Sequence, residues 1–210
     1  METNNIFEPN KKSANFSVVV ITCVAFFALL LWEKSITKGT FYGNTVWFLL
    51  EHGALYGPKV LEGEWYRLIT YLFLHSGPDH LINNMLILFF MGSALERYLG
   101  KIKYLVLYFS SGILAAIGSI VYNMMCSTSF PVCIGASGAV FGVSGAMACL
   151  VLINRGNLEG LTKKQMLVFL GLSVYGGFVS QGVDNIAHIT GLLSGFVLAA
   201  LLYRRKPSEE

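Results

Sequence analysis

Two residues inside long apolar stretches carry the side chains that nucleophilic catalysis requires. Ser137 lies in the string GASG at positions 135–138, and His188 lies in the string AHITG at positions 187–191. A serine hydroxyl is a poor nucleophile until a neighbouring base accepts its proton, and a serine–histidine pair within hydrogen-bond reach is the smallest group that meets this need. Polar groups are costly inside lipid, so each one in an apolar segment is a functional hypothesis.

A second pair of polar residues, His80 and Asn84, lies in another apolar stretch. They are four residues apart, which places both on one face of a predicted helix. Each polar residue alone is better explained by a hydrogen bond to a neighbouring helix, but the set at one depth favours a site.

The composition indicates an integral membrane protein. Of 210 residues, 54% are hydrophobic and 13% are charged, whereas soluble domains carry about 25% charged residues. A net charge of +3 is too small to suggest nucleic-acid binding. Six apolar stretches approach the roughly 20 residues that a transmembrane helix needs, and none alternates as a membrane barrel would. The predicted spans are 16–32, 78–95, 104–125, 134–153, 165–180 and 185–203.

The basic residues predict the orientation. With the N-terminus inside, eleven Lys and Arg residues fall on inner segments and four on outer segments, which predicts that both termini are cytoplasmic. The second, fourth and sixth spans then all begin on the outer side. The candidate residues therefore lie at similar shallow depths on that side. Residues 1–13 and 206–210 are predicted cytoplasmic tails around one membrane domain, residues 14–205.

Glycine spacing favours close packing of the fourth and sixth spans. Glycines recur at intervals of three and four, which forms smooth stripes that let two backbones approach. In the sixth span these glycines share a face with His188, so packing through the stripes would bring Ser137 and His188 together. The same stripes also fit ordinary helix packing. They consist of Gly135, Gly138, Gly142 and Gly145 in the fourth span, and Gly191 and Gly195 in the sixth.

The sequence predicts a long outer loop that lies on the membrane, over residues 33–77. The loop is rich in aromatic residues, including Trp65, which favour the headgroup level. Arg67 is expected to anchor the loop or to meet lipid phosphate. Cys126 and Cys133 flank a later outer connection and could pair in an oxidising compartment, but their spacing does not decide this.

Four sequence elements in order resemble the rhomboid family of intramembrane serine proteases, in the six-helix form usual in bacteria. They are WYR at 65–67, His80 with Asn84, GASG at 135–138 followed by Gly142, and AHITG at 187–191 followed by Gly195. One such element arises easily by chance, but four in order, each on the expected helix, form a specific signal. The implied fold is an all-α polytopic bundle of six transmembrane helices with a long membrane-associated first outer loop.

The resemblance implies a serine endopeptidase that cleaves in or near transmembrane segments. Ser137 would be the nucleophile, and His188 the general base and then the general acid. His80, Asn84 and the Ser137 N–H would stabilise the oxyanion. The implied supporting residues include Gly135, which lets that N–H turn into the site, and Phe141, which stacks on His188 where relatives often have tyrosine. The other supporting residues are Gly138, Gly191, Gly195, Trp65 and Arg67.

The resemblance also implies a cellular setting. The expected location is the inner (cytoplasmic) membrane, with the active site facing its outer side. The expected partners are transmembrane protein substrates and the lipid bilayer, and no cofactor or metal is expected. Neither the oligomeric state nor the substrate is indicated.

Other membrane-protein functions would require motifs or residue placements that this sequence lacks. A zinc protease would show a His-Glu-x-x-His helix, and a membrane aspartyl protease needs mid-membrane aspartates, whereas Asp79 and Asp184 lie at helix ends. Asp184 fits a helix cap better than a third catalytic residue. A transporter would need charged or broken helices near the midplane. The remaining alternative is a rhomboid-like protein that binds and escorts transmembrane segments without cleaving them, but such proteins typically lack the serine or the histidine.

Overall fold

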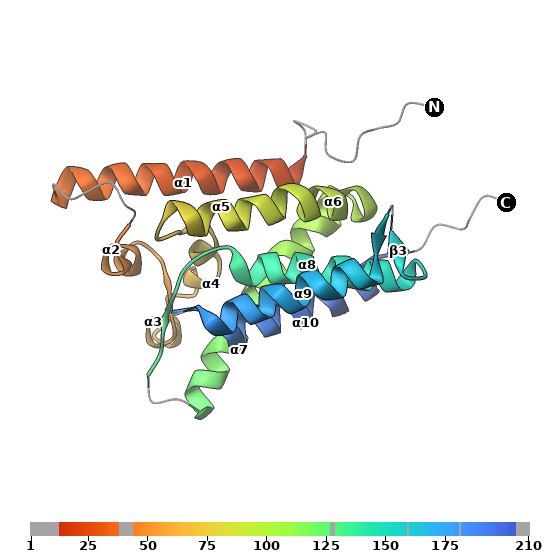
Figure 1. The fold of residues 1–210 in the computed structure, drawn as a ribbon. Coiled ribbons are helices and arrows are strands. Elements are labelled where there is room, and N and C mark those ends of the chain that lie inside the picture. The colour runs from red at the N-terminus through yellow and green to blue at the C-terminus, as the bar shows by residue number, and fades with distance from the viewer. Residues whose placement is uncertain (1–12, 38–43, 127–128, 159, 181, 205–210) are drawn as a thin grey trace.

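Long helices account for most of the structure, in agreement with the predicted all-α class (Figure 1). The computed structural model describes residues 13–37, 44–126, 129–158, 160–180 and 182–204. The predicted tails lie outside these residues, apart from Ser13. That residue is buried and donates a hydrogen bond from its hydroxyl to the Glu96 carboxylate at 2.5 Å.

Three of the helices in the described part are long and apolar enough to cross a membrane. They are α1 (Ala14–Thr37), α7 (Lys101–Cys126) and α10 (Asn185–Leu202). A fourth apolar helix, α8 (Ser137–Ile153), has 17 residues and is about 26 Å long at 1.5 Å per residue. This is slightly less than the roughly 30 Å hydrocarbon core of a bilayer. The helices support a multi-pass membrane protein, and six crossings stay a prediction.

The predicted second and fifth spans are also helical. The second consists of α5 (Pro78–Ile87), a π-helical turn η2 (Leu88–Gly92) and α6 (Ser93–Leu99), which follow one another without a gap. The fifth is α9 (Lys163–Val179), which begins with a capping box between Thr162 and Gln165.

Several helices extend beyond the apolar spans predicted for them, and one begins later. The first span was predicted as 16–32, and α1 continues to Thr37. The second span was predicted to end at 95 and α6 continues to Leu99, while α7 begins at Lys101, before the predicted third span at 104. The fourth span was predicted from residue 134, but α8 begins at Ser137. Gly135 has a φ of +110°, which is outside the helical region, so the helix cannot include it.

The predicted outer loop folds into short elements. A two-residue strand within it, β1, pairs antiparallel with β2, the strand that precedes Ser137, and Leu55 lies opposite Cys133. Outside this loop, a short β3–β4 hairpin joins α8 to α9. The short elements are α2 (Val46–Glu51), β1 (Leu55–Tyr56), α3 (Gly57–Leu61), α4 (Arg67–Thr70), η1 (Tyr71–Phe73), β2 (Val132–Cys133), β3 (Asn157–Leu158) and β4 (Leu161–Thr162).

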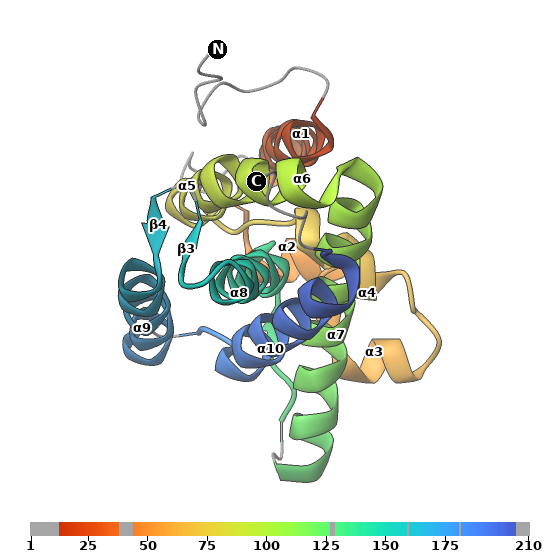
Figure 2. The ribbon, with the colours of Figure 1, turned by 90° about the vertical axis from the view of Figure 1, so that its right-hand side faces the viewer.

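Helix α8 lies at the centre of the bundle, with α5, α7, α9 and α10 around it (Figure 2). Most of its residues are buried on every face. The start of α1, the end of α6 and the β3–β4 hairpin lie at one end of the bundle, and α2 and α3 lie at the other (Figure 1). Ser137 is therefore surrounded by helices that can each present a side chain to it.

The predicted glycine stripes meet where α8 packs on α10. A Cβ added to Gly191 would collide with the Gly138 carbonyl, and one added to Gly195 would collide with the Gly142 carbonyl. Gly142 also makes room for Ser111 of α7. Glycine at these positions lets the two backbones touch directly.

Candidate active site

Ser137 is placed by a tight turn at the start of α8. The turn depends on Gly135, whose positive φ disfavours any side chain. The Gly135 N–H donates a hydrogen bond to the Tyr71 carbonyl at 3.0 Å. A Cβ at this position would lie 2.5 Å from Cε1 of His80. Gly135 therefore both shapes the turn and leaves space for the His80 ring beside Ser137.

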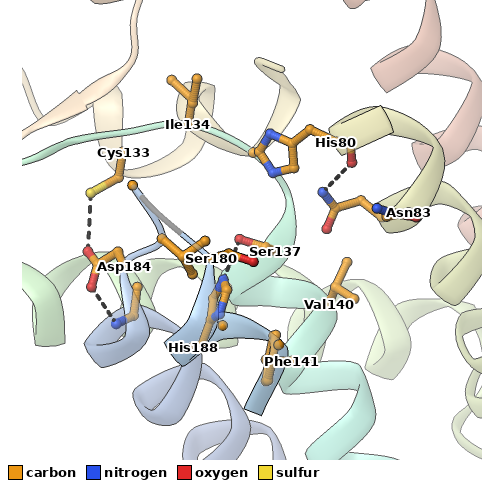
Figure 3. A pocket seen from close by; sticks show the side chains of 18 of the residues that line it. His80, Asn83, Cys133, Ile134, Ser137, Val140, Phe141, Ser180, Asp184 and His188 are labelled. Carbon is orange, nitrogen blue, oxygen red and sulfur yellow. Dashed lines mark hydrogen bonds between the residues drawn. The ribbon is translucent and has the colours of Figure 1, made fainter. Parts of the chain in front are cut away.

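The structure brings Ser137 and His188 together. Nε2 of His188 lies 2.9 Å from Oγ of Ser137, although the two residues are 51 positions apart. Phe141, one turn after Ser137, stacks on the His188 ring with centroids 4.2 Å apart and planes at 13°. Figure 3 shows this contact, with His80 reaching toward the same space from α5. A base in this position can accept the serine proton directly.

The other ring nitrogen of His188, Nδ1, forms no hydrogen bond to a carboxylate in the described part of the chain. Nδ1 of His188 is buried and finds no hydrogen-bond partner among the described residues. Asp184 instead caps α10, where its Oδ1 accepts a hydrogen bond from the Ala187 N–H at 3.0 Å. The arrangement is a serine–histidine pair, and the role of Asp184 as a cap is confirmed.

The two candidate oxyanion donors lie beside this pair. His80 is half-buried at the start of α5, over the Gly135 turn. Asn84 is buried, and its amide donates a hydrogen bond to the His80 carbonyl at 2.8 Å. Its second amide hydrogen is directed toward Nε2 of His75, 3.4 Å away. Asn84 must therefore exchange one of these contacts to reach a substrate oxyanion.

His75 supports the site from beneath the residue that precedes Ser137. It is fully buried, and the burial together with the charge of nearby His80 lowers the pKa of His75 to about 3. The ring is therefore neutral at physiological pH, and its Nε2 accepts a hydrogen bond from the Ala136 N–H at 3.4 Å. This contact holds the residue before Ser137. No local motif marks it, because it joins residues 61 positions apart.

Apart from His75 and Ala136, the residues described above border one pocket of about 610 Å³. The pocket reaches from the Ser137–His188 pair to α5 on one side and α9 on the other, and Phe169 lines its α9 wall together with the small residues Ser173, Gly176 and Gly177. Among the described residues, no group of three or more His, Cys, Asp or Glu side chains could hold a metal ion. The lining includes His80, Asn83, Asn84, Cys133, Gly135, Ser137, Phe141, Ser173, Gly176, Gly177, Ser180, Asp184 and His188.

Trp65 and Arg67 lie apart from the pocket. Trp65 is 70% exposed, whereas Arg67 is 1% exposed. The Arg67 guanidinium donates to the Leu50 and Ala54 carbonyls, each at 2.7 Å, and pairs with Glu64 at 2.6 Å. Of the two expectations for Arg67, anchoring of the loop is the one that the structure matches. All four cysteines, including Cys126 and Cys133, are free thiols.

Replacing Asn84 with alanine is expected to slow catalysis without abolishing it. Loss of one oxyanion donor costs about 10²-fold in kcat, and the His80 ring and the Ser137 N–H would remain. The measurement is kcat for peptide-bond cleavage by the purified variant in detergent or liposomes. An unchanged kcat would remove Asn84 from the candidate donors, and complete loss of activity with an unchanged fold would mean that it has a more direct role.

Comparisons with known proteins point to one family. The model of the rhomboid domain matches residues 62–205. The chain is 32% identical over 197 residues to the rhomboid protease GluP of Bacillus subtilis, covering 94% of this chain and 36% of that protein. It is 36% identical over 151 residues to the putative rhomboid protease YdcA of the same organism, covering 72% of this chain and 74% of that protein. RHOMBOID-like protein 5 of Arabidopsis thaliana is 37% identical over 176 residues, covering 82% of this chain and 55% of that protein. The chain thus spans about a third of the first relative and three quarters of the second.

Proposed function

Because this chain belongs to the rhomboid family, we propose that it is an intramembrane serine endopeptidase in which Ser137 and His188 form the catalytic dyad. The observation that carries the proposal is the 2.9 Å contact between Oγ of Ser137 and Nε2 of His188. Two of its bacterial relatives bear the name of rhomboid protease, one of them as putative, which supports intramembrane proteolysis as the activity of this chain.

The first half of the reaction forms an acyl-enzyme. Oγ of Ser137 attacks the scissile carbonyl carbon while Nε2 of His188 accepts the hydroxyl proton. The carbonyl oxygen becomes an oxyanion, which the Ser137 N–H, the His80 ring and the Asn84 amide stabilise. When the tetrahedral intermediate collapses, His188 gives its proton to the leaving amine, and the C–N bond breaks.

The second half consumes water. His188 accepts a proton from a water molecule that attacks the acyl carbon, and then returns it to Oγ of Ser137 as the acid product leaves. The water must reach a site that is otherwise surrounded by apolar helices. The pocket supports this step, because Ser137 and His188 are each only partly buried and polar residues of α5 and α9 continue its wall.

The membrane setting is part of the proposal. Six crossings with both termini in the cytoplasm put the starts of α5, α8 and α10 on the outer side of the inner membrane. Substrate transmembrane segments would then be cut near their outer ends. The distribution of basic residues supports this orientation.

The test is cleavage of a single-span substrate that is reconstituted with the purified chain in liposomes. We expect two product fragments whose new ends, mapped by mass spectrometry, lie in or next to the transmembrane segment. Binding of the substrate with no fragment after prolonged incubation would favour the escort function. Solute or proton flux across the liposome membrane would favour a transporter.

A further inference from the structure

The carboxylate of Asp184 joins three elements of the site. Its Oδ1 caps α10, as described above, and its Oδ2 accepts hydrogen bonds from the Ser119 hydroxyl of α7 and from the Cys133 thiol of β2. The Cys133 Sγ–Oδ2 distance is 3.1 Å. Figure 3 shows Cys133, Asp184 and the start of α10 in line along one side of the pocket.

We propose that Asp184 is a positioning residue. Through its bond to Cys133, it keeps β2, the strand that precedes Ser137, in a fixed position relative to α10, the helix that carries His188. The inference rests on the proposed function, since it explains how the dyad keeps its geometry. Asp184 lies one helical turn before His188, and Cys133 lies four residues before Ser137. The Asp184–Cys133 bond therefore runs beside the Ser137–His188 contact and links the same two segments.

The segment that this bond holds forms part of the pocket wall. Residues 131–135 line the pocket but belong to no helix. On one edge β2 pairs with β1, where Leu55 lies opposite Cys133. The Cys133 thiol also links the strand to the start of α10, through its hydrogen bond to Asp184. The Gly135 turn, which directs the Ser137 N–H, follows two residues later, so movement of β2 would misplace the nucleophile and its backbone donor together.

The Cys133 thiol is suited to donate in this bond. Burial and the nearby Asp184 raise the pKa of the thiol, so the thiol keeps its proton and can donate it. Oδ2 of Asp184 accepts two hydrogen bonds and Oδ1 accepts one. An asparagine at position 184 could accept only part of this set, because its amide nitrogen cannot accept a hydrogen bond.

Four variants separate positioning from helix capping. Asp184→Asn keeps a good N-cap but loses the acceptor for Cys133, whereas Asp184→Ala loses both. Cys133→Ala removes the donor, and Cys133→Ser restores a donor of similar shape. Asp79→Asn is the matched control, because it removes an exposed carboxylate from the first turn of α5.

The readouts are kcat and KM for substrate cleavage, the rate of labelling of Ser137 by a fluorophosphonate, and the unfolding temperature. We expect Asp184→Asn and Cys133→Ala to lower kcat and the labelling rate about tenfold, because small displacements of catalytic groups are costly. KM and the unfolding temperature should stay near those of the wild type. Cys133→Ser and Asp79→Asn should stay within about twofold of the wild-type kcat.

Three results would overturn the inference while leaving the proposed function in place. They are wild-type kcat in both Asp184→Asn and Cys133→Ala, equal losses in Cys133→Ser and Cys133→Ala, and a loss confined to Asp184→Ala, which would reduce Asp184 to a cap. If the wild type itself neither cleaves nor reacts at Ser137, the proposed function fails, and the positioning role fails with it.

Discussion

Replacing either Ser137 or His188 with alanine is expected to lower kcat for cleavage of a transmembrane substrate by at least about 10³-fold. Without Oγ of Ser137 the nucleophile is lost, and His188 is the one base that hydrogen-bonds to that oxygen among the described residues. The two residues act as a unit, so the double variant should be no slower than either single variant. The measurement is fragment formation in liposomes by wild type and the three variants.

Ser194→Ala is the matched control for the serine change. The Ser194 hydroxyl bonds to the Gly191 carbonyl within α10 at 2.9 Å and does not line the pocket. Its loss should leave kcat unchanged. The Ser137 and His188 variants should unfold within a few degrees of the wild type, because each side chain is only partly buried. Wild-type cleavage by Ser137→Ala, or an equal loss in Ser194→Ala, would contradict the assignment.

Replacing Gly195 with alanine is expected to impair both stability and catalysis. The added Cβ would collide with the Gly142 carbonyl of α8, so α10 must move away from α8. Overpacking of this kind costs about 1–3 kcal/mol of the free energy of unfolding. Because His188 lies two turns before Gly195 on the same helix, a shift near 1 Å would lower kcat by up to about 10²-fold. The measurements are unfolding temperature and kcat.

Gly171→Ala provides the comparison for this prediction. Gly171 lies within α9, and a Cβ at that position would meet nothing within 4 Å. The substitution there adds the same atom to a helix without a collision, and the higher helix propensity of alanine favours it slightly. Equal behaviour of the two alanine variants would mean that the α8–α10 contact does not control the position of His188.

The local sequence predicted the helices and the packing of α8 on α10 for physical reasons. Hydrophobic runs define helices because a membrane interior satisfies no backbone hydrogen bond. Glycines at intervals of three and four fall on one helix face, and two such stripes fit together. This pattern indicated that Ser137 and His188 would lie close, and the stacking of Phe141 on His188 followed from the family resemblance rather than from spacing.

Long-range contacts and local backbone geometry could not be predicted from the sequence. Hydropathy carries no information on φ, so it extended the fourth span to residue 134 although the Gly135 turn delays α8 until Ser137. The contact of His75 with Ala136 and that of Asp184 with Cys133 each join residues more than 50 positions apart. No periodic pattern encodes such pairs, because each depends on how separate elements pack in three dimensions.

The most direct test of the dyad is to treat the reconstituted protein with a fluorophosphonate and to map the adduct by mass spectrometry. A serine activated by His188 reacts with this reagent, whereas an ordinary hydroxyl does not. We expect one adduct, on Ser137, which disappears in His188→Ala. An unmodified Ser137 in the folded wild-type protein, or an adduct that persists without His188, would contradict it.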